Sequence, residues 1–123
     1  MNQDSLTGKV IGCAIDVHRE LGPGLLENTY QQCLAYELNL NGIGFKLEQA
    51  LPVKYKEIQL DCGYRIDLLV EDKLIIELKA VDKIHNIHKA QLLTYMKLSS
   101  ISTGLLINFN VELLKDGIQR FKI

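Results

Sequence analysis

The chain has 123 residues, of which 47% are hydrophobic and 24% are charged, and its formal net charge is −1. This is the composition of an ordinary globular protein, and the length suffices for one hydrophobic core, so we expect a single domain over residues 1–123. The near-neutral charge argues against a strongly basic protein that wraps nucleic acid, although it leaves room for a local basic groove. The sequence has no apolar run as long as a membrane span and no signal peptide, which predicts a cytoplasmic protein without membrane contact.

Two helices are predicted at the start of the chain. The first follows a cap at Asp4 or Ser5 and ends at the Gly-Pro-Gly of residues 22–24. Its apolar residues recur with helical spacing: Leu6, Val10, Cys13, Ala14, Val17 and Leu21. The second helix runs from about Leu25 to Asn39, with an apolar face made of Leu26, Tyr30, Cys33, Leu34 and Leu38.

Glu27 stands out in the second helix, because it falls on the side that the apolar spacing predicts to be buried. A carboxylate there is costly unless it is paired or binds a cation. A position near the helix start also favours a negative charge, because the N-terminal end of the helix dipole is positive. The spacing leaves both interpretations of Glu27 open.

A series of extended segments follows the two helices. Alternating or β-prone composition marks residues 43–51, which residues 53–55 continue or restart, and residues 58–60, which lead into two further segments at 64–70 and 74–79. The last two are joined by a polar turn into a hairpin, around which the rest of the chain is organised. We therefore expect three or four antiparallel strands after the helices.

Three charged residues, Asp67, Glu77 and Lys79, interrupt the otherwise apolar runs of this hairpin. A two-residue loop would place Asp67 opposite Ile76 and send Glu77 to the other face, whereas a three-residue loop at 71–73 places Asp67 opposite Glu77. Our hypothesis is the three-residue loop, or a bulge with the same effect. The two carboxylates then share a face and repel each other unless a positive charge lies between them.

Two chemical interpretations of this acidic pair are open. Lys79 offsets one negative charge, and a divalent cation such as Mg²⁺ offsets more, because hard cations bind a few carboxylate oxygens together with water. The alternative is an ordinary ladder of surface ion pairs, which stabilises a protein little. The spacing E-x-K alone does not decide between a metal site and such a ladder.

The last third of the chain predicts one more helix and two more strands. The helix spans about His85 to Leu98, and one of its faces combines polar groups with an apolar one: His88, Gln91, Leu92 and Tyr95. The apolar run at 103–109 predicts a strand buried on both faces and reached by a right-handed crossover, and residues 118–123 predict an edge strand. The predicted fold class is therefore α/β, with one mixed sheet covered by helices.

Four segments in this order resemble a known family: GPGLLENTY at 22–30, RIDLLVEDKLIIELKA at 65–80, AQLLTYMKL at 90–98 and GLLINF at 104–109. Together they are similar to the GxxExxY protein family, which is placed in the PD-(D/E)XK nuclease superfamily. The name-giving motif is Gly24, Glu27 and Tyr30 in this sequence. The resemblance implies a PD-(D/E)XK nuclease-like (restriction-endonuclease-like) core, with a central mixed β-sheet flanked by helices.

The resemblance also implies roles for individual residues. It implies Mg²⁺ as the cofactor, with Mn²⁺ as an alternative ion, at a site of three acids: Glu27, Asp67 and Glu77. It implies a catalytic lysine and a supporting pair on the third helix: Lys79, Gln91 and Tyr95. Ile66 precedes Asp67 where the superfamily motif has proline, a departure that removes no ligand.

The chemistry that the resemblance implies is hydrolysis of phosphodiester bonds. The cation polarises the phosphodiester and lowers the pKa of a bound water. Lys79 orients or deprotonates that water, while Gln91 and Tyr95 donate hydrogen bonds to a phosphate or to the metal ligands. Three cationic side chains are candidates for contact with the nucleic-acid backbone, with simple solvation as the alternative: Arg65, Lys83 and Lys89.

The functional expectation is therefore a Mg²⁺-dependent nuclease, with DNA preferred to RNA as its substrate. The alternative is a catalytically silent nucleic-acid-binding or accessory module that keeps the nuclease fold, with which small size and near-neutral charge agree. A chain of this size is also expected to need a homodimer to grip and cut duplex DNA. The sequence does not indicate endo- or exonucleolytic cleavage, or the number of metal ions.

Overall fold

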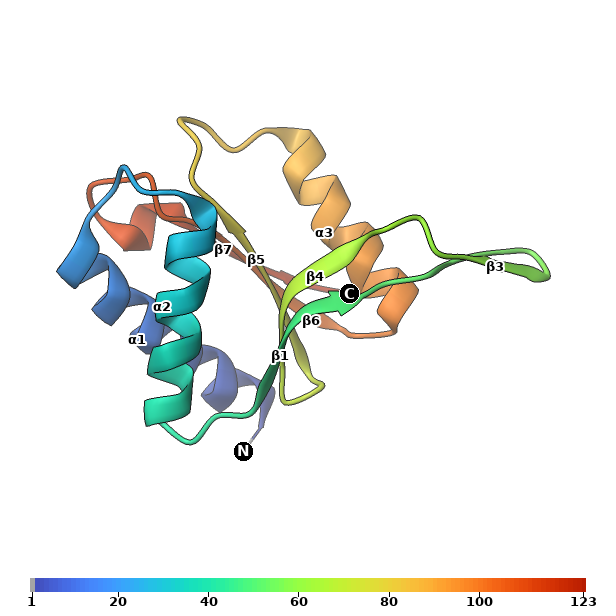
Figure 1. Cartoon of the computed structure of the whole chain (residues 1–123), viewed down its shortest axis with the longest axis horizontal. Helices are drawn as coiled ribbons and strands as arrows, with labels where there is room; N and C mark the ends of the chain where they lie inside the picture. Colours follow the sequence, from blue (N-terminus) through green and yellow to red (C-terminus); the bar gives the residue numbers. More distant parts are fainter. Residues whose placement is uncertain (1) are drawn as a thin grey trace.

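The computed structural model describes residues 2–123 and shows a five-stranded sheet with helices on both faces (Figure 1). The elements follow one another in this order: α1 (Gln3–Leu21), α2 (Glu27–Leu40), β1 (Phe45–Ala50), β2 (Val53–Tyr55), β3 (Ile58–Leu60), β4 (Arg65–Val70), β5 (Leu74–Lys79), α3 (Asn86–Ser99), β6 (Thr103–Asn108), η1 (Leu114–Gly117) and β7 (Ile118–Lys122). This mixed sheet flanked by helices confirms the predicted fold class. Within residues 2–123, none of the helices combines the length and the apolar character that crossing a bilayer requires.

The five-stranded sheet has the strand order β1-β4-β5-β6-β7. β4 is antiparallel to both β1 and β5, β6 is parallel to β5, and β7 returns antiparallel at the edge. A parallel pair needs a crossover connection, and α3 provides it between β5 and β6. The six residues of β6 are all buried, as the apolar run at 103–109 predicts.

Two hydrophobic cores lie on the two faces of the sheet. α1 and α2 cover one core, which includes Val10, Leu34, Leu68, Ile76 and Ile107. α3 covers the other core, which includes Ile66, Ile75, Leu92, Met96 and Leu106. β4 and β5 run between these two layers and carry the charged residues that the sequence analysis singled out.

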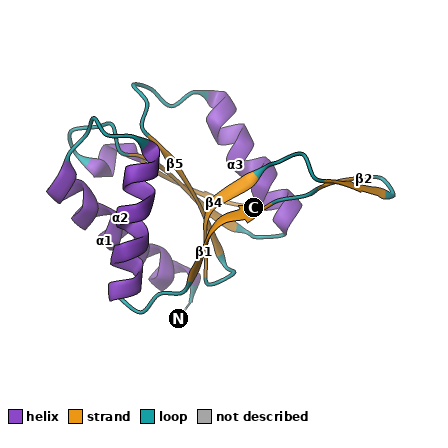
Figure 2. Ribbon diagram, viewed as in Figure 1, coloured by secondary structure: helices purple, strands orange, loops and turns teal. Residues whose placement is uncertain are grey.

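The β2–β3 hairpin does not join the central sheet, so the prediction of one sheet is wrong in this segment. β2 and β3 pair only with each other, and the hairpin projects from the end of the sheet (Figures 1 and 2). Pro52 follows β1 and has no N–H group to donate to a neighbouring strand. Gly63, with a φ of 80°, turns the chain back towards β4.

The first two helices begin at other residues than predicted. The side chain of Asn2, rather than that of Asp4 or Ser5, caps α1 and accepts a hydrogen bond from the backbone N–H of Ser5 at 2.8 Å. α2 begins at Glu27 because Leu26 keeps an extended backbone. Leu26 is 76% exposed and does not belong to the apolar face of the helix.

Candidate functional site

The β4–β5 hairpin has the register that brings the two strand carboxylates opposite each other. Val70 pairs with Leu74 and Leu68 pairs with Ile76, which confirms the three-residue loop at 71–73. Glu71 and Asp72 in this loop both have a φ of 53°, and the Lys73 N–H closes the turn on the Val70 carbonyl at 2.9 Å. Continuing the register by one pair places Asp67 opposite Glu77.

At the Asp67–Glu77 pair, side-chain carboxylates accept hydrogen bonds from the backbone of the opposite strand. Asp67 Oδ2 accepts a hydrogen bond from the Leu78 N–H at 2.9 Å. Glu77 Oε1 accepts a longer one from the Asp67 N–H at 3.3 Å. Each carboxylate therefore holds the backbone of the opposite strand. Asp67 is half-buried, and Glu77 is only 5% exposed.

Burial raises the pKa of both carboxyl groups. Loss of solvation is the largest cause in each case and brings the pKa of Asp67 to about 6 and that of Glu77 to about 8. The negative charge of Asp67 raises the pKa of Glu77 further, whereas the backbone hydrogen bonds and the Lys79 ammonium lower both pKa values. Without a further positive charge, the pair therefore retains a proton at neutral pH.

Lys79 and Glu27 belong to the same electrostatic environment as this pair. Lys79, half-buried at the end of β5, lowers the pKa of both strand carboxyls. Glu27 raises the pKa of Asp67, and its Oε2 accepts a hydrogen bond from the Ala80 N–H at 3.4 Å. The Glu27 side chain is exposed rather than buried, in the first turn of α2 where the dipole favours a negative charge, although its hydrogen bond to Ala80 directs it towards the end of β5 as the spacing predicts.

A cavity of about 190 Å³ lies beside the strand pair, between α2 and the end of the sheet. Half of its lining residues are acids: Glu27, Asn28, Gln31, Glu48, Asp67 and Leu78. Gln31 of α2 connects two of the strands that form it, because its Nε2 donates to Glu48 Oε2 at 3.3 Å and to the Asp67 carbonyl at 3.0 Å. The polar end of α2 and the acidic end of the sheet thus face one another.

Glu48 is a site residue that the sequence analysis missed. It falls opposite Asp67 in the β1–β4 register and has a φ of 50°, which interrupts the extended strand. The strand opposite is also irregular, since Ile66 and Leu68 lie in cores on opposite faces, whereas regular alternation would place them on the same face. An exposed polar residue in an edge strand is ordinary, so the sequence carried no signal for Glu48.

Gln91 and Tyr95 form a hydrogen-bonded pair on α3. Gln91 Nε2 donates to the Tyr95 hydroxyl at 2.9 Å, and the Tyr95 ring meets the Tyr64 ring edge-on at 6.1 Å between centroids. Burial raises the pKa of Tyr95, and the charges of Glu77 and Asp67 add to this effect. The pair therefore lies within electrostatic reach of the two strand carboxylates.

The family model of the PD-(D/E)XK nuclease superfamily matches residues 4–121. The chain belongs to the PD-(D/E)XK nuclease superfamily. The match covers almost the whole chain and confirms the superfamily that the four sequence segments indicated. No curated protein and no solved structure matches the chain. PD-(D/E)XK nucleases act on nucleic acids and generally use divalent metal ions, so this membership indicates a nuclease-type function.

The donor atoms of the site suit a hard divalent cation, although they do not form a complete metal site. Within residues 2–123, no group of three or more His, Cys, Asp and Glu side chains lies close enough together to hold a metal ion. Glu27, Asp67 and Glu77 are thus neighbours without being a preassembled cluster. Asp67 and Glu77 nevertheless offer carboxylate oxygens, and burial, which raises the pKa of both groups, disfavours their negative charge in the absence of a cation. Two such carboxylates and water are ligands that Mg²⁺ accepts.

The three cations predicted to contact nucleic acid lie on three different segments of this PD-(D/E)XK domain. Arg65 is exposed at the start of β4, where its Nη1 donates to the Tyr64 carbonyl at 2.9 Å and lies 3.7 Å from Asp61 Oδ1. Lys83 is exposed in the loop before α3, and Lys89 is half-buried in α3 itself. Their contact with nucleic acid stays a prediction.

Two residues of the G-x-x-E-x-x-Y motif shape the backbone rather than the chemistry. The Tyr30 hydroxyl donates to the Gly22 carbonyl at 2.6 Å and accepts from the Leu25 N–H at 3.1 Å. The Tyr30 ring stacks on Phe109 with centroids 4.4 Å apart, and Gly24 has a φ of 102°. These contacts fix the loop that leads into Glu27.

Asn108 is a second residue whose role the sequence analysis missed, since it counted only as part of a buried strand. It lies at the end of β6 and is 3% exposed. Its Oδ1 accepts from the Val81 N–H at 3.1 Å, and its Nδ2 donates to the Val81 carbonyl at 2.9 Å. The amide thereby extends the pairing of β5 with β6 past the last backbone pair and fixes the chain just after Lys79.

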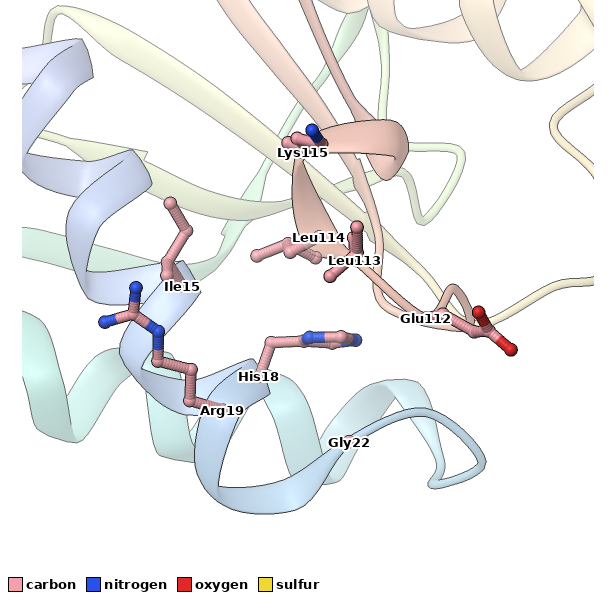
Figure 3. A pocket seen from close by; sticks show the side chains of 8 residues that line it. All are labelled: Ile15, His18, Arg19, Gly22, Glu112, Leu113, Leu114 and Lys115. Atoms are coloured by element: carbon pink, nitrogen blue, oxygen red, sulfur yellow. The ribbon is translucent and has the colours of Figure 1, made fainter.

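A larger cavity, of about 460 Å³, lies away from the acids, between α1 and η1. Its lining combines apolar and charged side chains: Ile15, His18, Arg19, Gly22, Glu112, Leu113, Leu114 and Lys115 (Figure 3). His18 is held there by a hydrogen bond from its Nε2 to the Val111 carbonyl at 2.8 Å. The carboxylate of Glu112 points away from the other side chains, so this cavity has no acidic pair and is not the candidate nuclease site.

Proposed function

We propose that the protein is a Mg²⁺-dependent nuclease that hydrolyses phosphodiester bonds of DNA, with Mn²⁺ as an alternative ion. The observation that carries the proposal is the Asp67–Glu77 pair, in which a half-buried and a buried carboxylate each bind the backbone of the opposite strand, with Lys79 close by. A surface ladder of ion pairs has no need to bury its acids, and buried acids cost stability. Binding of a divalent cation offsets this cost, and PD-(D/E)XK nucleases generally use divalent metal ions.

Asp67 and Glu77 are the proposed primary metal ligands, with the Leu78 carbonyl as a third donor. Glu27 and Glu48 line the adjoining cavity and can accept hydrogen bonds from metal-bound water. When bound, a divalent ion supplies a Lewis acid that polarises the phosphodiester and acidifies a water molecule. We propose that Glu27 completes the metal site, either as a direct ligand after a small movement of its side chain or through a bound water molecule.

Lys79 is the proposed catalytic lysine. Its ammonium is positioned by β5 beside the two carboxylates, and it orients the attacking water and offsets negative charge on the phosphoryl oxygens. The segment that follows Lys79 is fixed by Asn108 through Val81, which limits the movement of the strand end.

The Gln91–Tyr95 pair has a defined direction of hydrogen bonding. Because the Tyr95 oxygen accepts from Gln91 Nε2, the hydroxyl hydrogen is free to donate to another group. The raised pKa of Tyr95 keeps this hydrogen in place at neutral pH. We propose that it donates to a phosphate oxygen or to a metal-bound carboxylate.

Arg65, Lys83 and Lys89 are the proposed contacts to the nucleic-acid backbone. They belong to the start of β4, the β5–α3 loop and α3, respectively. A homodimer is proposed for cleavage of duplex DNA, because one copy provides one site. Loss of any single cation is expected to weaken binding equally for all sequences and to reduce its salt dependence.

The test is a cleavage assay with plasmid, single-stranded DNA and RNA over a range of Mg²⁺ and Mn²⁺ concentrations. Wild-type protein is compared with two variants. Lys79→Ala removes the proposed catalytic lysine, and Lys97→Ala removes an exposed lysine from the C-terminal end of α3. We expect metal-dependent cleavage of DNA. The cleavage rate should fall by at least about 100-fold in Lys79→Ala and should be unchanged in Lys97→Ala. Cleavage that is equal in wild type and Lys79→Ala would show a contaminating nuclease and refute the proposal.

The second candidate function is a silent nucleic-acid-binding module, and the lack of a preassembled three-acid cluster within residues 2–123 favours it. Titration calorimetry with Mn²⁺ separates the two functions before any cleavage assay. Binding that Asp67→Asn abolishes supports the nuclease. Retention of DNA by a protein that binds no Mn²⁺ and cuts nothing supports the binding module.

A further inference from the structure

His88 lies in the first turn of α3, on the face of the helix that also carries Gln91 and Tyr95. It precedes these residues by three and seven positions, and side chains at these separations lie above one another on an α-helix. The His88 side chain is half-buried. The loop after β5 leads directly to this end of α3 (Figure 1), so His88 and Lys79 lie on either side of one short loop.

A backbone hydrogen bond fixes the protonation state of the His88 ring. The N–H of His85, the residue before α3, donates to His88 Nδ1 at 3.0 Å. A ring nitrogen accepts only when it carries no hydrogen, so the ring is neutral and its hydrogen is on Nε2. Within residues 2–123, the structure gives this Nε2–H group no acceptor, and the nitrogen is not buried, since Thr103 Oγ1 is the one fully buried side-chain polar atom there without a partner. His88 thus presents an open donor.

Two charged residues of the candidate site act on the His88 ring. Loss of solvation is the largest cause that lowers the pKa of His88, and the Lys79 ammonium and the neighbouring His85 lower it further, whereas Glu27 raises it. Lys79 and Glu27 therefore lie within electrostatic reach of His88, although they belong to β5 and α2. The lowered pKa agrees with a ring that is neutral at neutral pH.

Lys79 and His88 together suit an anionic ligand. The ammonium is a charged donor and the Nε2–H group is a neutral one, so an anionic oxygen that reaches both is stabilised by both. Among residues 2–123, no carboxylate forms an ion pair with Lys79. The nearby carboxylate of Glu27 is bound by the Ala80 N–H instead. In a nuclease the anionic oxygens that arrive at such donors are those of the phosphates.

We propose that His88 is a substrate-binding residue whose Nε2–H group donates a hydrogen bond to a phosphate oxygen of the nucleic acid, next to Lys79. The contact presupposes the proposed nuclease function, which brings a nucleic acid to the site. The proposed contacts of Arg65, Lys83 and Lys89 are cationic and release counterions from DNA, whereas His88 is neutral. Its contact therefore adds affinity without adding to the salt dependence of binding.

The test is fluorescence anisotropy of labelled single-stranded and duplex DNA in EDTA, over roughly 50 to 200 mM salt. His88→Leu removes both ring nitrogens, whereas His88→Gln keeps an acceptor for the His85 N–H and a donor for phosphate. We expect His88→Leu to weaken binding by about three- to tenfold at every salt concentration, with an unchanged slope of log affinity against log salt. His88→Gln should bind nearly as the wild type does, and so should His85→Leu, which leaves the backbone N–H in place.

NMR of the imidazole nitrogens tests the same contact in the wild-type protein, whether or not His88→Leu disturbs the start of α3. The chain has three histidines, and His85→Leu and His88→Gln assign their signals. We expect His88 Nδ1 to have the chemical shift of an unprotonated nitrogen at neutral pH. The Nε2–H signal of His88 should move when DNA is added, while circular dichroism and thermal melting check the folding of each variant.

Several results would overturn the proposal: wild-type affinity in His88→Leu, an equal loss of affinity in His85→Leu, or an Nε2–H signal that DNA leaves unchanged. A lower salt slope in His88→Leu would show a cationic ring and would overturn the neutral contact. Both measurements are made in EDTA and need no cleavage. A protein that binds DNA through His88 but cuts nothing would refute the nuclease and place the contact in the silent binding module.

Discussion

The carboxylate of Glu77 accepts a hydrogen bond from the backbone N–H of Asp67, and the carboxylate of Asp67 binds the N–H of the residue after Glu77. These two bonds connect β4 to β5 where side chains replace backbone pairing. The same atoms therefore serve the fold and the proposed chemistry. Substitutions at either residue are expected to affect stability, pH dependence and metal binding together.

The stability of the metal-free protein should fall as pH rises from about 5 to 9. The folded-state pKa values of Asp67 and Glu77, about 6 and 8, lie above their ordinary values of 3.8 and 4.5. The folded state thus holds protons that the unfolded state releases. This stabilisation is fully present below the ordinary values and is lost as pH rises through the folded ones. Thermal melting in EDTA over this range measures it.

Glu77→Gln is the matched variant for this pH dependence, because its amide is neutral at every pH. We expect it to reduce the loss of melting temperature between pH 6 and 9. Glu57→Gln, at an exposed position on the hairpin, should leave the loss unchanged. A wild-type melting temperature that rises steadily over the whole interval would contradict the raised pKa values.

Affinity for divalent cations should increase with pH. Asp67 and Glu77 must both be deprotonated to act as ligands, and their pKa values of about 6 and 8 make this costly in mildly acidic solution. We expect the affinity for Mn²⁺ to rise at least about tenfold between pH 6 and 8, with protons released on binding. Calorimetry in two buffers of different ionisation enthalpy counts those protons. Binding that is independent of pH would exclude these two carboxylates as the ligands.

Tyr95→Phe should lower the cleavage rate by about 10- to 100-fold while leaving metal affinity nearly unchanged. The substitution removes the hydroxyl that Gln91 holds and keeps the ring that contacts Tyr64. Single-turnover cleavage and Mn²⁺ calorimetry on the same preparation separate the two effects. Tyr36→Phe, at an exposed position on α2, is the control. An unchanged rate in Tyr95→Phe would remove the hydroxyl from the proposed mechanism.

Gly104→Ala should destabilise the protein by about 1–3 kcal/mol. A Cβ at this position of β6 would lie 2.8 Å from Met96 Sδ and 3.0 Å from Leu92 Cδ1, both on α3. The helix that carries Gln91 and Tyr95 would have to move outwards. Gly8→Ala is the opposite control, since nothing lies within 4 Å of its Cβ in α1, and we expect about 0.5–1 kcal/mol of added stability there. Urea unfolding of both variants decides; equal stability in Gly104→Ala and wild type would show that α3 is not closely packed on β6.

The sequence predicted the parts of the fold that depend on periodic burial. The structure follows the apolar spacing in the stripe from Leu6 to Val17, in the helix at 85–98 and in the doubly buried strand at 103–109, whereas Leu21 at the end of the stripe is exposed. The β4–β5 register needed a choice between two loop lengths, and the charges at Asp67 and Glu77 favoured the correct one. Periodicity is informative here because a buried helix face needs an apolar residue at every turn and a buried strand face needs one at every second position.

Features that depend on single backbone angles or on distant neighbours escaped the sequence analysis. Glu48 lines the cavity and has a backbone φ of 50°, and nothing in the sequence around it predicts this angle. Glu27 is exposed because α2 begins at that residue, and helix ends are poorly marked when no side chain caps them. The hairpin at 53–60 separates from the sheet through Pro52 and Gly63, although its residues alternate like those of a half-buried strand.

The contacts of Tyr30 have a consequence for how the G-x-x-E-x-x-Y signature is interpreted. Gly24 and Tyr30 govern the bend between two helices, whereas the paired acids that would bind an ion lie some forty residues further along. A related protein could lack the equivalent of Glu77 and still contain the complete signature. In this chain the signature therefore reports the architecture, whereas the proposed activity depends on the Asp67–Glu77 pair in the hairpin.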